Sequence, residues 1–224
     1  MTERVPLPKV LDDLTERSAA PALVRVALER LVDGAPTQVE RAAADPALAA
    51  ALVAVLAASR SITRVIEARP VDTVDVLARL DRRPSESTID DADSLAAWRD
   101  LEFLRIAARD LVGLDALEAV GDGLARLGRD VLSHAHRLTA TDDDATIAVI
   151  GMGKLAGEEL NYSSDIDVMF VGEGPRPVLD RRARAIMDIA RRCFRVDANL
   201  RPEGRDGPLV RSVESFESYW ERWA

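Results

Sequence analysis

The chain has 224 residues, which allows one large domain or two small ones. Its formal net charge of −9 argues against general nucleic-acid binding, because that needs a positive field. The single cysteine, Cys193, excludes an intrachain disulfide. The N-terminus lacks a secretory signal, and the longest apolar run, 47–58, is shorter than the roughly 20 residues that span a bilayer. We therefore expect a cytoplasmic protein that binds neither nucleic acid nor membrane.

The first part of the chain, residues 1–140, is predicted to be a helical region. It is rich in Ala, Leu and Arg and poor in aromatic residues, which suits helices. Apolar residues spaced by three or four predict two long amphipathic helices, over 94–112 and 115–136. The polar segment 82–92 before them contains proline and is predicted to be a loop.

The pattern changes after residues 139–144, an acidic turn that we interpret as the boundary between two domains, 1–140 and 141–224. Residues 146–150 form a continuous apolar run, which is typical of a central buried strand. The fold class is therefore predicted as α+β, with the helical region followed by a small mixed sheet flanked by helices. The remaining elements expected are a short helix, a strand, a loop, an Arg-rich helix, a strand and a last helix (154–161, 165–171, 172–177, 178–193, 194–200 and 212–224).

The last predicted helix has an apolar face formed by Val213, Phe216, Trp220 and Trp223. An apolar face at the end of a chain needs a partner surface to cover it. We therefore expect the second domain to be truncated at its C-terminus, with the covering surface in downstream sequence.

A turn reading Gly151-Met-Gly153-Lys154 lies between a predicted strand and a predicted helix. Glycines let the backbone approach a phosphate, and a helix N-terminus adds partial positive charge. Of the 30 Lys and Arg residues only Lys9 and Lys154 are lysine, and a compact ammonium fits a tight turn better than a planar guanidinium. The spacing is not that of a Walker A loop. A dinucleotide-binding turn stays open as an alternative, with Ala156 at its third position.

Three aspartates are candidates for a metal site. Asp165 and Asp167 are two apart on a predicted strand, so their side chains share one face. Asp197 lies on the next predicted strand and joins them if the two strands pair. Three carboxylates repel one another without a cation, and two divalent cations would clamp an in-line displacement at phosphorus. Ser163 and Ser164 precede the pair and would either bind a phosphate oxygen or cap the turn.

The segments GMGKLAGEELNYSSDIDVMF (151–170) and VDANLRPEGRDGPLV (196–210) carry a resemblance to a known family. They resemble the bifunctional glutamine synthetase adenylyltransferase/adenylyl-removing enzymes, within the nucleotidyltransferase superfamily. The helical segment LEFLRIAARDLVGLDAL, which starts at Leu101, resembles the helices before the first catalytic domain of that family. Gly153-Lys154 stands where Gly-Gly or Gly-Ser is usual in the superfamily, which is a departure from the general pattern.

The resemblance implies a nucleotidyltransferase-type sheet and Mg²⁺-dependent nucleotidyl transfer that controls the adenylylation of glutamine synthetase. The amino-acid sequences of 151–154 and 159–162 are more similar to the adenylyl-removing half of the family, which uses phosphate to remove AMP from a tyrosine. The opposite reaction, ATP-dependent adenylyl transfer to the tyrosine, is the other direction that the resemblance allows. The alternatives are a nucleotidyltransferase with a different acceptor, and an inactive fragment that only binds nucleotide or glutamine synthetase.

The same resemblance assigns roles to residues and names partners. It implies Asp165, Asp167 and Asp197 as catalytic ligands of two Mg²⁺ ions, and Arg201 and Arg205 as phosphate contacts. The expected partners are glutamine synthetase and, through regions outside this chain, a nitrogen-regulatory signal protein. The full set expected to bind ATP, ADP or the adenylyl group is Gly151, Gly153, Lys154, Ser164, Arg201 and Arg205.

Overall fold

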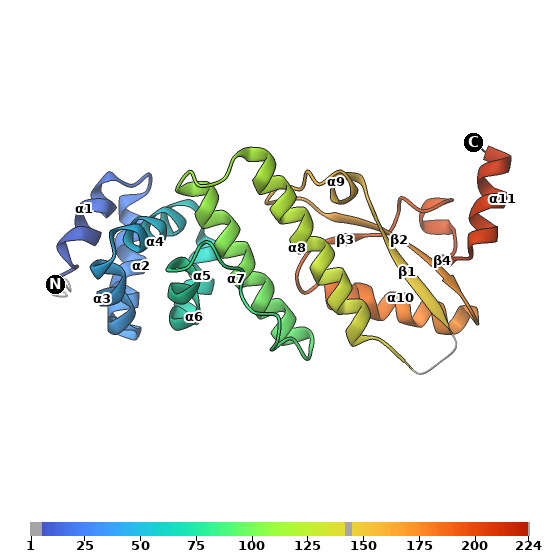
Figure 1. Ribbon diagram of the computed structural model, residues 1–224, viewed down its shortest axis with the longest axis horizontal. Helices are drawn as coiled ribbons and strands as arrows, with labels where there is room; N and C mark the ends of the chain where they lie inside the picture. Colours follow the sequence, from blue (N-terminus) through green and yellow to red (C-terminus); the bar gives the residue numbers. More distant parts are fainter. Residues whose placement is uncertain (1–5, 142–144, 224) are drawn as a thin grey trace. The chain divides into compact units, whose positions relative to one another are not determined.

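The computed structural model describes residues 6–141 and 145–223, and these form two compact units (Figure 1). The helical unit comprises Met1–Ser85 and Asp100–Val120, and the sheet unit comprises Glu86–Arg99 and Gly121–Ala224, within the described residues. The α+β class is confirmed. The proposed domain division at residue 140 stays a prediction, and positions 142–144 of the acidic turn lie outside the described residues. None of the helices in the described ranges is both long and apolar enough to cross a membrane.

The helical unit is built from short helices that surround the apolar helix α4. Asp45 caps α4 by accepting hydrogen bonds from the backbone N–H groups of Ala47 (2.9 Å) and Leu48 (3.2 Å). Proline occupies the first turn of α2, α3, α4 and α6, where its missing N–H costs no hydrogen bond. The helices are α1 (Lys9–Arg17), α2 (Pro21–Gly34), α3 (Pro36–Ala44), α4 (Pro46–Ala58), α5 (Arg60–Ala68), α6 (Pro70–Leu77) and the later part of α7 (Ala92–Leu111).

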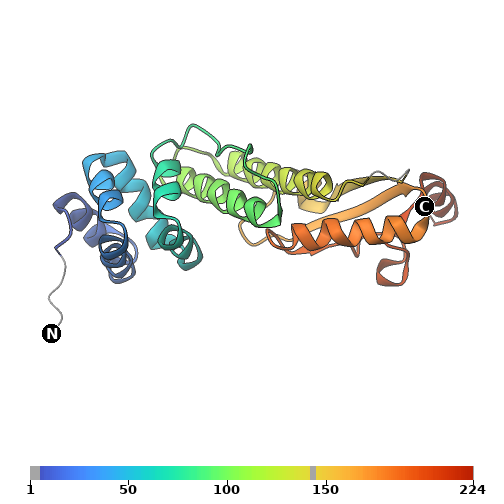
Figure 2. The same ribbon diagram turned by 90° about the horizontal axis from the view of Figure 1, so that it is seen from below.

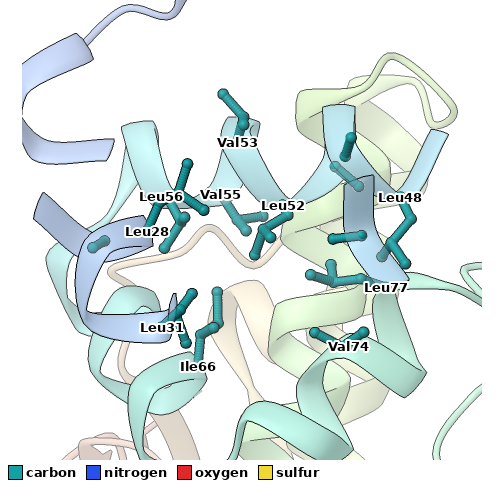
Figure 3. Close-up of a cluster of buried hydrophobic side chains, with 14 of the residues drawn as sticks. Leu28, Leu31, Leu48, Leu52, Val53, Val55, Leu56, Ile66, Val74 and Leu77 are labelled. Carbon is teal, nitrogen blue, oxygen red and sulfur yellow. The ribbon is translucent and has the colours of Figure 1, made fainter. Parts of the chain in front are cut away.

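The core of this unit is aliphatic, and α4 contributes to it all around its circumference. The apolar run of α4 is therefore a buried helix, which agrees with its being too short to span a bilayer. Figure 3 shows side chains from α2, α4, α5 and α6 converging on one cluster. The labelled members are Leu28, Leu31, Leu48, Leu52, Val53, Val55, Leu56, Ile66, Val74 and Leu77.

Among the described residues of the helical unit one carboxylate is buried, and it is paired with arginines. Glu102 on α7 is only 2% exposed. Its oxygens accept hydrogen bonds from Arg83 (3.0 Å) and from two nitrogens of Arg105 (both 2.8 Å). Nearby, Arg109 holds Asp115 through two further bonds, of 2.7 and 2.5 Å. Such pairs offset the desolvation of a buried charge.

The sheet unit contains a mixed sheet of four strands. Strand β2 is central: β1 pairs with it antiparallel, and β3 and β4 pair with it in parallel. Figure 2 shows α10 running along this sheet, and its buried side chains, such as Ile186 and Ala183, form the packing face. The strands are β1 (Thr146–Met152), β2 (Ile166–Glu173), β3 (Val196–Asp197) and β4 (Val210–Arg211); the helices are the start of α7, then α8 (Leu117–Leu138), α9 (Gly153–Ala156), α10 (Arg176–Ala190) and α11 (Val213–Trp223).

The prediction that residues 146–150 form the central strand was wrong. Within the described residues β1 pairs only with β2, so it is an edge strand. Its side chains alternate: Ile147 is buried, whereas Ile150 is 40% exposed. A continuous apolar run forms a central strand only when other parts of the protein cover both of its faces. Here the face that carries Ile150 is open to solvent.

Two other elements are shorter than predicted, and local chemistry explains both. The predicted strand 194–200 pairs only at Val196–Asp197, because Asp197 Oδ1 accepts the N–H of Asn199 (2.7 Å) and turns the chain. The predicted helix 154–161 ends at Ala156, before Glu158 adopts a left-handed φ of 58°. The short strand β4 has no distinct sequence signal and was not predicted.

Candidate active site

Asp167 lies at the centre of the sheet, where three strands meet. On β2 it is opposite Met152 of β1 on one side and Asp197 of β3 on the other. The buried residues Ile166 and Val168 occupy the opposite face, as the strand alternation predicted. Ile150 lies beside Met169 on the same face as Asp167, so the carboxylate projects from the open side of the sheet.

The electrostatics of Asp167 show that the aspartates act on one another. Burial raises the pKa of Asp167 above its usual range, and the charges of Asp197 and Asp165 raise it further. Lys154 opposes this shift and lowers the pKa. The three carboxylates and the ammonium are therefore close enough to interact, as a site for a divalent cation requires.

The other two carboxylates have protein partners in this structure. Asp165 Oδ1 is 2.5 Å from a guanidinium nitrogen of Arg195, while Asp197 Oδ1 accepts the N–H of Asn199. In the part of the chain that the structure describes, no three His, Cys, Asp or Glu side chains form a ready-made metal cage. The register puts Asp167 and Asp197 side by side on neighbouring strands, and Asp165 immediately precedes β2.

The Gly-Lys turn packs directly against Asp167. Gly153 has a φ of +53°, and a Cβ added there would lie 2.9 Å from Asp167 Oδ2. Glycine is therefore needed both for backbone conformation and for space. Lys154 is exposed. Helix α9 has only four residues, so the expected contribution of a helix dipole is small.

Two residues that were predicted to bind phosphate, Gly151 and Ser164, make structural contacts, and their phosphate-binding role stays a prediction. Gly151 faces the core, where a Cβ would meet the Leu155 side chain at 3.1 Å. Ser164 Oγ accepts the N–H of Asn161 (3.1 Å), so it caps the turn before β2, one of the two roles left open by the sequence.

A pocket of about 520 Å³ lies beside the carboxylates, between α10 and the segment that follows β3. Arg201 lines it, but its guanidinium donates to the backbone carbonyls of Ala198 (2.5 Å), Gly207 (3.3 Å) and Arg205 (3.3 Å). Arg201 therefore holds this loop in place. The side chain of Arg205 lines the pocket as well. The lining residues are Asp165, Arg184, Met187, Arg191, Val196, Asp197, Ala198, Asn199, Arg201, Arg205 and Leu209.

Two of these residues, Arg184 and Arg191, were not predicted to belong to the site. In the sequence they stand out only as members of an Arg-rich predicted helix. Their spacing is a usable signal: Arg184, Met187 and Arg191 are three and four apart, so they occupy one face of a helix. That face is the one α10 turns towards the pocket.

A carboxylate on the central strand, a second just before it, a third on the parallel neighbour β3 and a Gly-Lys turn after β1 are the features expected of a nucleotidyltransferase. A sequence model of the family described as glutamate-ammonia ligase adenylyltransferase matches residues 40–191 and 185–224. The chain belongs to this family of transferases.

Curated relatives agree with this assignment. Proteins named bifunctional glutamine synthetase adenylyltransferase/adenylyl-removing enzyme are similar to it in several bacteria. The relative from Mycobacterium tuberculosis is 44% identical over 146 residues, covering 56% of this chain and 15% of the relative. The relative from Cutibacterium acnes is 32% identical over 223 residues, covering 80% of this chain and 23% of the relative. The chain thus spans less than a quarter of the length of these relatives.

Proposed function

We propose that this chain carries the catalytic groups of a Mg²⁺-dependent nucleotidyl transfer on glutamine synthetase, in the direction that removes AMP from a tyrosine. The observation that carries the proposal is the group around Asp167, whose pKa is raised by burial and by its two carboxylate neighbours. Perturbed carboxylates of this kind are typical of functional sites. The relatives' name, which includes adenylyl removal, supplies the substrate.

In the proposed reaction an oxygen of inorganic phosphate bonds to the phosphorus of the adenylyl group while the bond to the tyrosine oxygen breaks. The tyrosine oxygen leaves and takes up a proton, and the products are ADP and unmodified protein. Cations held by Asp165, Asp167 and Asp197 would stabilise the negative charge on the transferred phosphoryl group. Lys154, across the sheet from Asp197, supplies a fixed positive charge for a phosphate oxygen. Asp197 orients the tyrosine oxygen, with its own position fixed by the N–H of Asn199.

The experiment is to incubate the chain with adenylylated glutamine synthetase, phosphate and Mg²⁺, and to measure ADP. We expect ADP to form with the natural sequence and to be lost in Asp165→Asn. Exchange of Arg176, an exposed residue of α10 outside the pocket, for Gln is the matched control and should leave the rate unchanged. AMP transfer to a different acceptor, with no ADP from this substrate, would contradict the proposal.

Transfer in the opposite direction, from ATP to the tyrosine, is the second candidate, because the relatives' name includes adenylyltransferase activity. The two directions differ in their nucleotide: removal depends on phosphate and yields ADP, whereas addition consumes ATP and yields pyrophosphate. Radiolabelled ATP and unmodified glutamine synthetase distinguish them. Incorporation of label that requires Asp165, without phosphate-dependent ADP release, would favour addition.

A further inference from the structure

A second pocket, of about 700 Å³, adjoins the one beside the carboxylates. Both pockets are lined by Arg191 and Val196, so they lie next to each other at the end of α10 and the start of β3. Together they form a surface that we call the basic groove. Its second half is lined by Arg99, Tyr162, Ser163, Ser164, Arg191, Arg192, Cys193, Phe194, Arg195 and Val196.

The basic groove concentrates positive charge in a chain whose net charge is −9. Four arginines line each half, with Arg191 common to both, and the carboxylates lining the groove are Asp165 and Asp197. These two carboxylates belong to the proposed cation site. With cations bound there, the groove is positive along its whole length.

Several of these guanidinium groups remain available to a ligand. Arg184 and Arg205 make no ion pair with any residue that the structure describes. Arg191 contacts Asp188 at 3.3 Å, and Arg192 contacts Asp93, but all four side chains are about half exposed or more. Exposed pairs of this kind contribute little stability, so an acidic ligand can replace the internal partner at low cost.

The extent of the groove indicates the shape of its ligand. A single phosphate is satisfied by one or two guanidinium groups, whereas this groove distributes its arginines over two pockets. An extended chain with several carboxylates matches that distribution. The exposed hydroxyls of Tyr162 and Ser163 add hydrogen-bonding groups along the second half.

The position of the groove indicates which substrate it serves. Lys154 follows β1, at one edge of β2, whereas the groove lies along β3, at the other edge. An in-line displacement needs entering and leaving groups on opposite sides of the phosphorus. If phosphate binds beside Lys154, the tyrosine must approach from the side of Asp197 and the groove.

We propose that the basic groove binds an acidic, extended peptide segment that carries the modified tyrosine, and so positions that tyrosine beside Asp197. This inference rests on the proposed function and adds to it the chemistry by which the protein substrate is recognised. Arg184 of α10 and Arg191, the residue that caps its C-terminus, are then substrate-binding residues on one side of this helix.

The test uses a fluorescein-labelled peptide of ten residues with a central Tyr flanked by Glu, and measures its binding to the chain by anisotropy. We expect binding that weakens with added salt and falls about 10-fold or more in the double variant Arg184→Gln/Arg191→Gln. Arg181→Gln is the matched control, because Arg181 is an exposed residue of the same helix that does not line the groove. A peptide with Gln in place of Glu should bind at least 10-fold more weakly.

Three outcomes would overturn the proposal: no binding of the acidic peptide, an equal loss in Arg181→Gln, or tighter binding of a single-stranded oligonucleotide of the same charge. Kinetics separate this inference from the proposed function. If ADP forms but the double variant leaves KM for adenylylated glutamine synthetase unchanged, the proposed role of the basic groove is wrong and the proposed function stands. If no ADP forms while the peptide binds as expected, the peptide-binding role of the groove stands and the proposed function is wrong.

Discussion

The two units use carboxylates in opposite ways. In the helical unit Glu102 is buried between two arginines, and the hydrogen bond from Arg109 lowers the pKa of Asp115. In the sheet unit Asp167 has carboxylate neighbours, and its pKa is raised. Glu102 and Asp115 are neutralised by arginines inside the protein, whereas Asp167 is left beside like charges, as functional carboxylates often are. The contrast marks Asp167 but not Asp165, which pairs with Arg195.

The largest effect expected is the loss of activity in Asp167→Asn. The carboxamide keeps the shape of the side chain but removes the charge that a cation requires, so the rate of ADP formation should fall by about 100-fold or more. Circular dichroism should show an unchanged fold. A variant that keeps more than a tenth of the activity would remove Asp167 from the proposed machinery.

The next effect concerns stability in the helical unit. Glu102→Ala leaves Arg83 and Arg105 without their buried partner, and should lower the free energy of unfolding by about 3–5 kcal/mol. The control is Asp75→Ala, which breaks the exposed pair with Arg41 and should cost about 1 kcal/mol or less. Urea unfolding followed by circular dichroism measures both. Equal losses in the two variants would show that burial does not distinguish these pairs.

A smaller loss of stability is expected at the Gly-Lys turn. Gly153→Ala forces a left-handed φ on alanine and brings its Cβ against Asp167, for a cost of about 1–2 kcal/mol. Gly34→Ala is the control, because a Cβ at that helix end meets nothing within 4 Å. Tryptophan fluorescence reports the first change, because Trp98, Trp220 and Trp223 all belong to the sheet unit, and circular dichroism reports the control in the helical unit. If Gly153→Ala is as stable as Gly34→Ala, the tight turn does not constrain the site.

The smallest effects are opposite pH dependences in the two units. Because the folded pKa of Asp115 is lowered, the pair with Arg109 stabilises the protein above the unfolded pKa, and this contribution is lost as pH falls through the folded value. Because the folded pKa of Asp167 is raised, its ionised form costs stability above that pKa, and the cost disappears as pH falls. Asp167→Asn should thus raise Tm at neutral pH, and Asp115→Asn should lower it.

At acidic pH, below the folded pKa of each group, the difference in Tm between each variant and the natural sequence should diminish. Thermal unfolding of the two variants and the natural sequence between neutral and acidic pH measures this. Changes of the same sign in the two variants would contradict the contrast between the units.

Much of this architecture could be predicted from the sequence, since it depends on local periodicity. The long helices α7 and α8 and the alternation of Ile166, Asp167 and Val168 follow from spacing alone. The edge position of β1 could not be predicted, because the sequence does not show which faces of a strand will be covered. The early end of β3 depends on one hydrogen bond that the backbone N–H of Asn199 donates to the carboxylate of Asp197. Such local bonds compete with strand pairing in ways that composition does not reveal.

Prediction of the candidate site from the sequence has the same limits. The three aspartates and Gly153 were predicted as site residues because each lies next to a strong pattern in the chain, and this role stays a prediction. Arg184 and Arg191 were missed because they lie far from Asp197 in sequence and join it only when α10 packs along the sheet (Figure 2). Conversely, Gly151 and Ser164 fit the pattern of phosphate-binding residues but have packing and capping roles.

We propose that Asp165, Asp167 and Asp197 together hold divalent cations. Thermal unfolding with and without Mg²⁺ tests this proposal most directly. We expect millimolar Mg²⁺ to raise the Tm of the transition that tryptophan fluorescence reports for the sheet unit, because binding to the folded state alone stabilises it. In Asp167→Asn the same concentration should leave that Tm unchanged. An unchanged Tm in the natural sequence, or an equal rise in both proteins, would contradict the account.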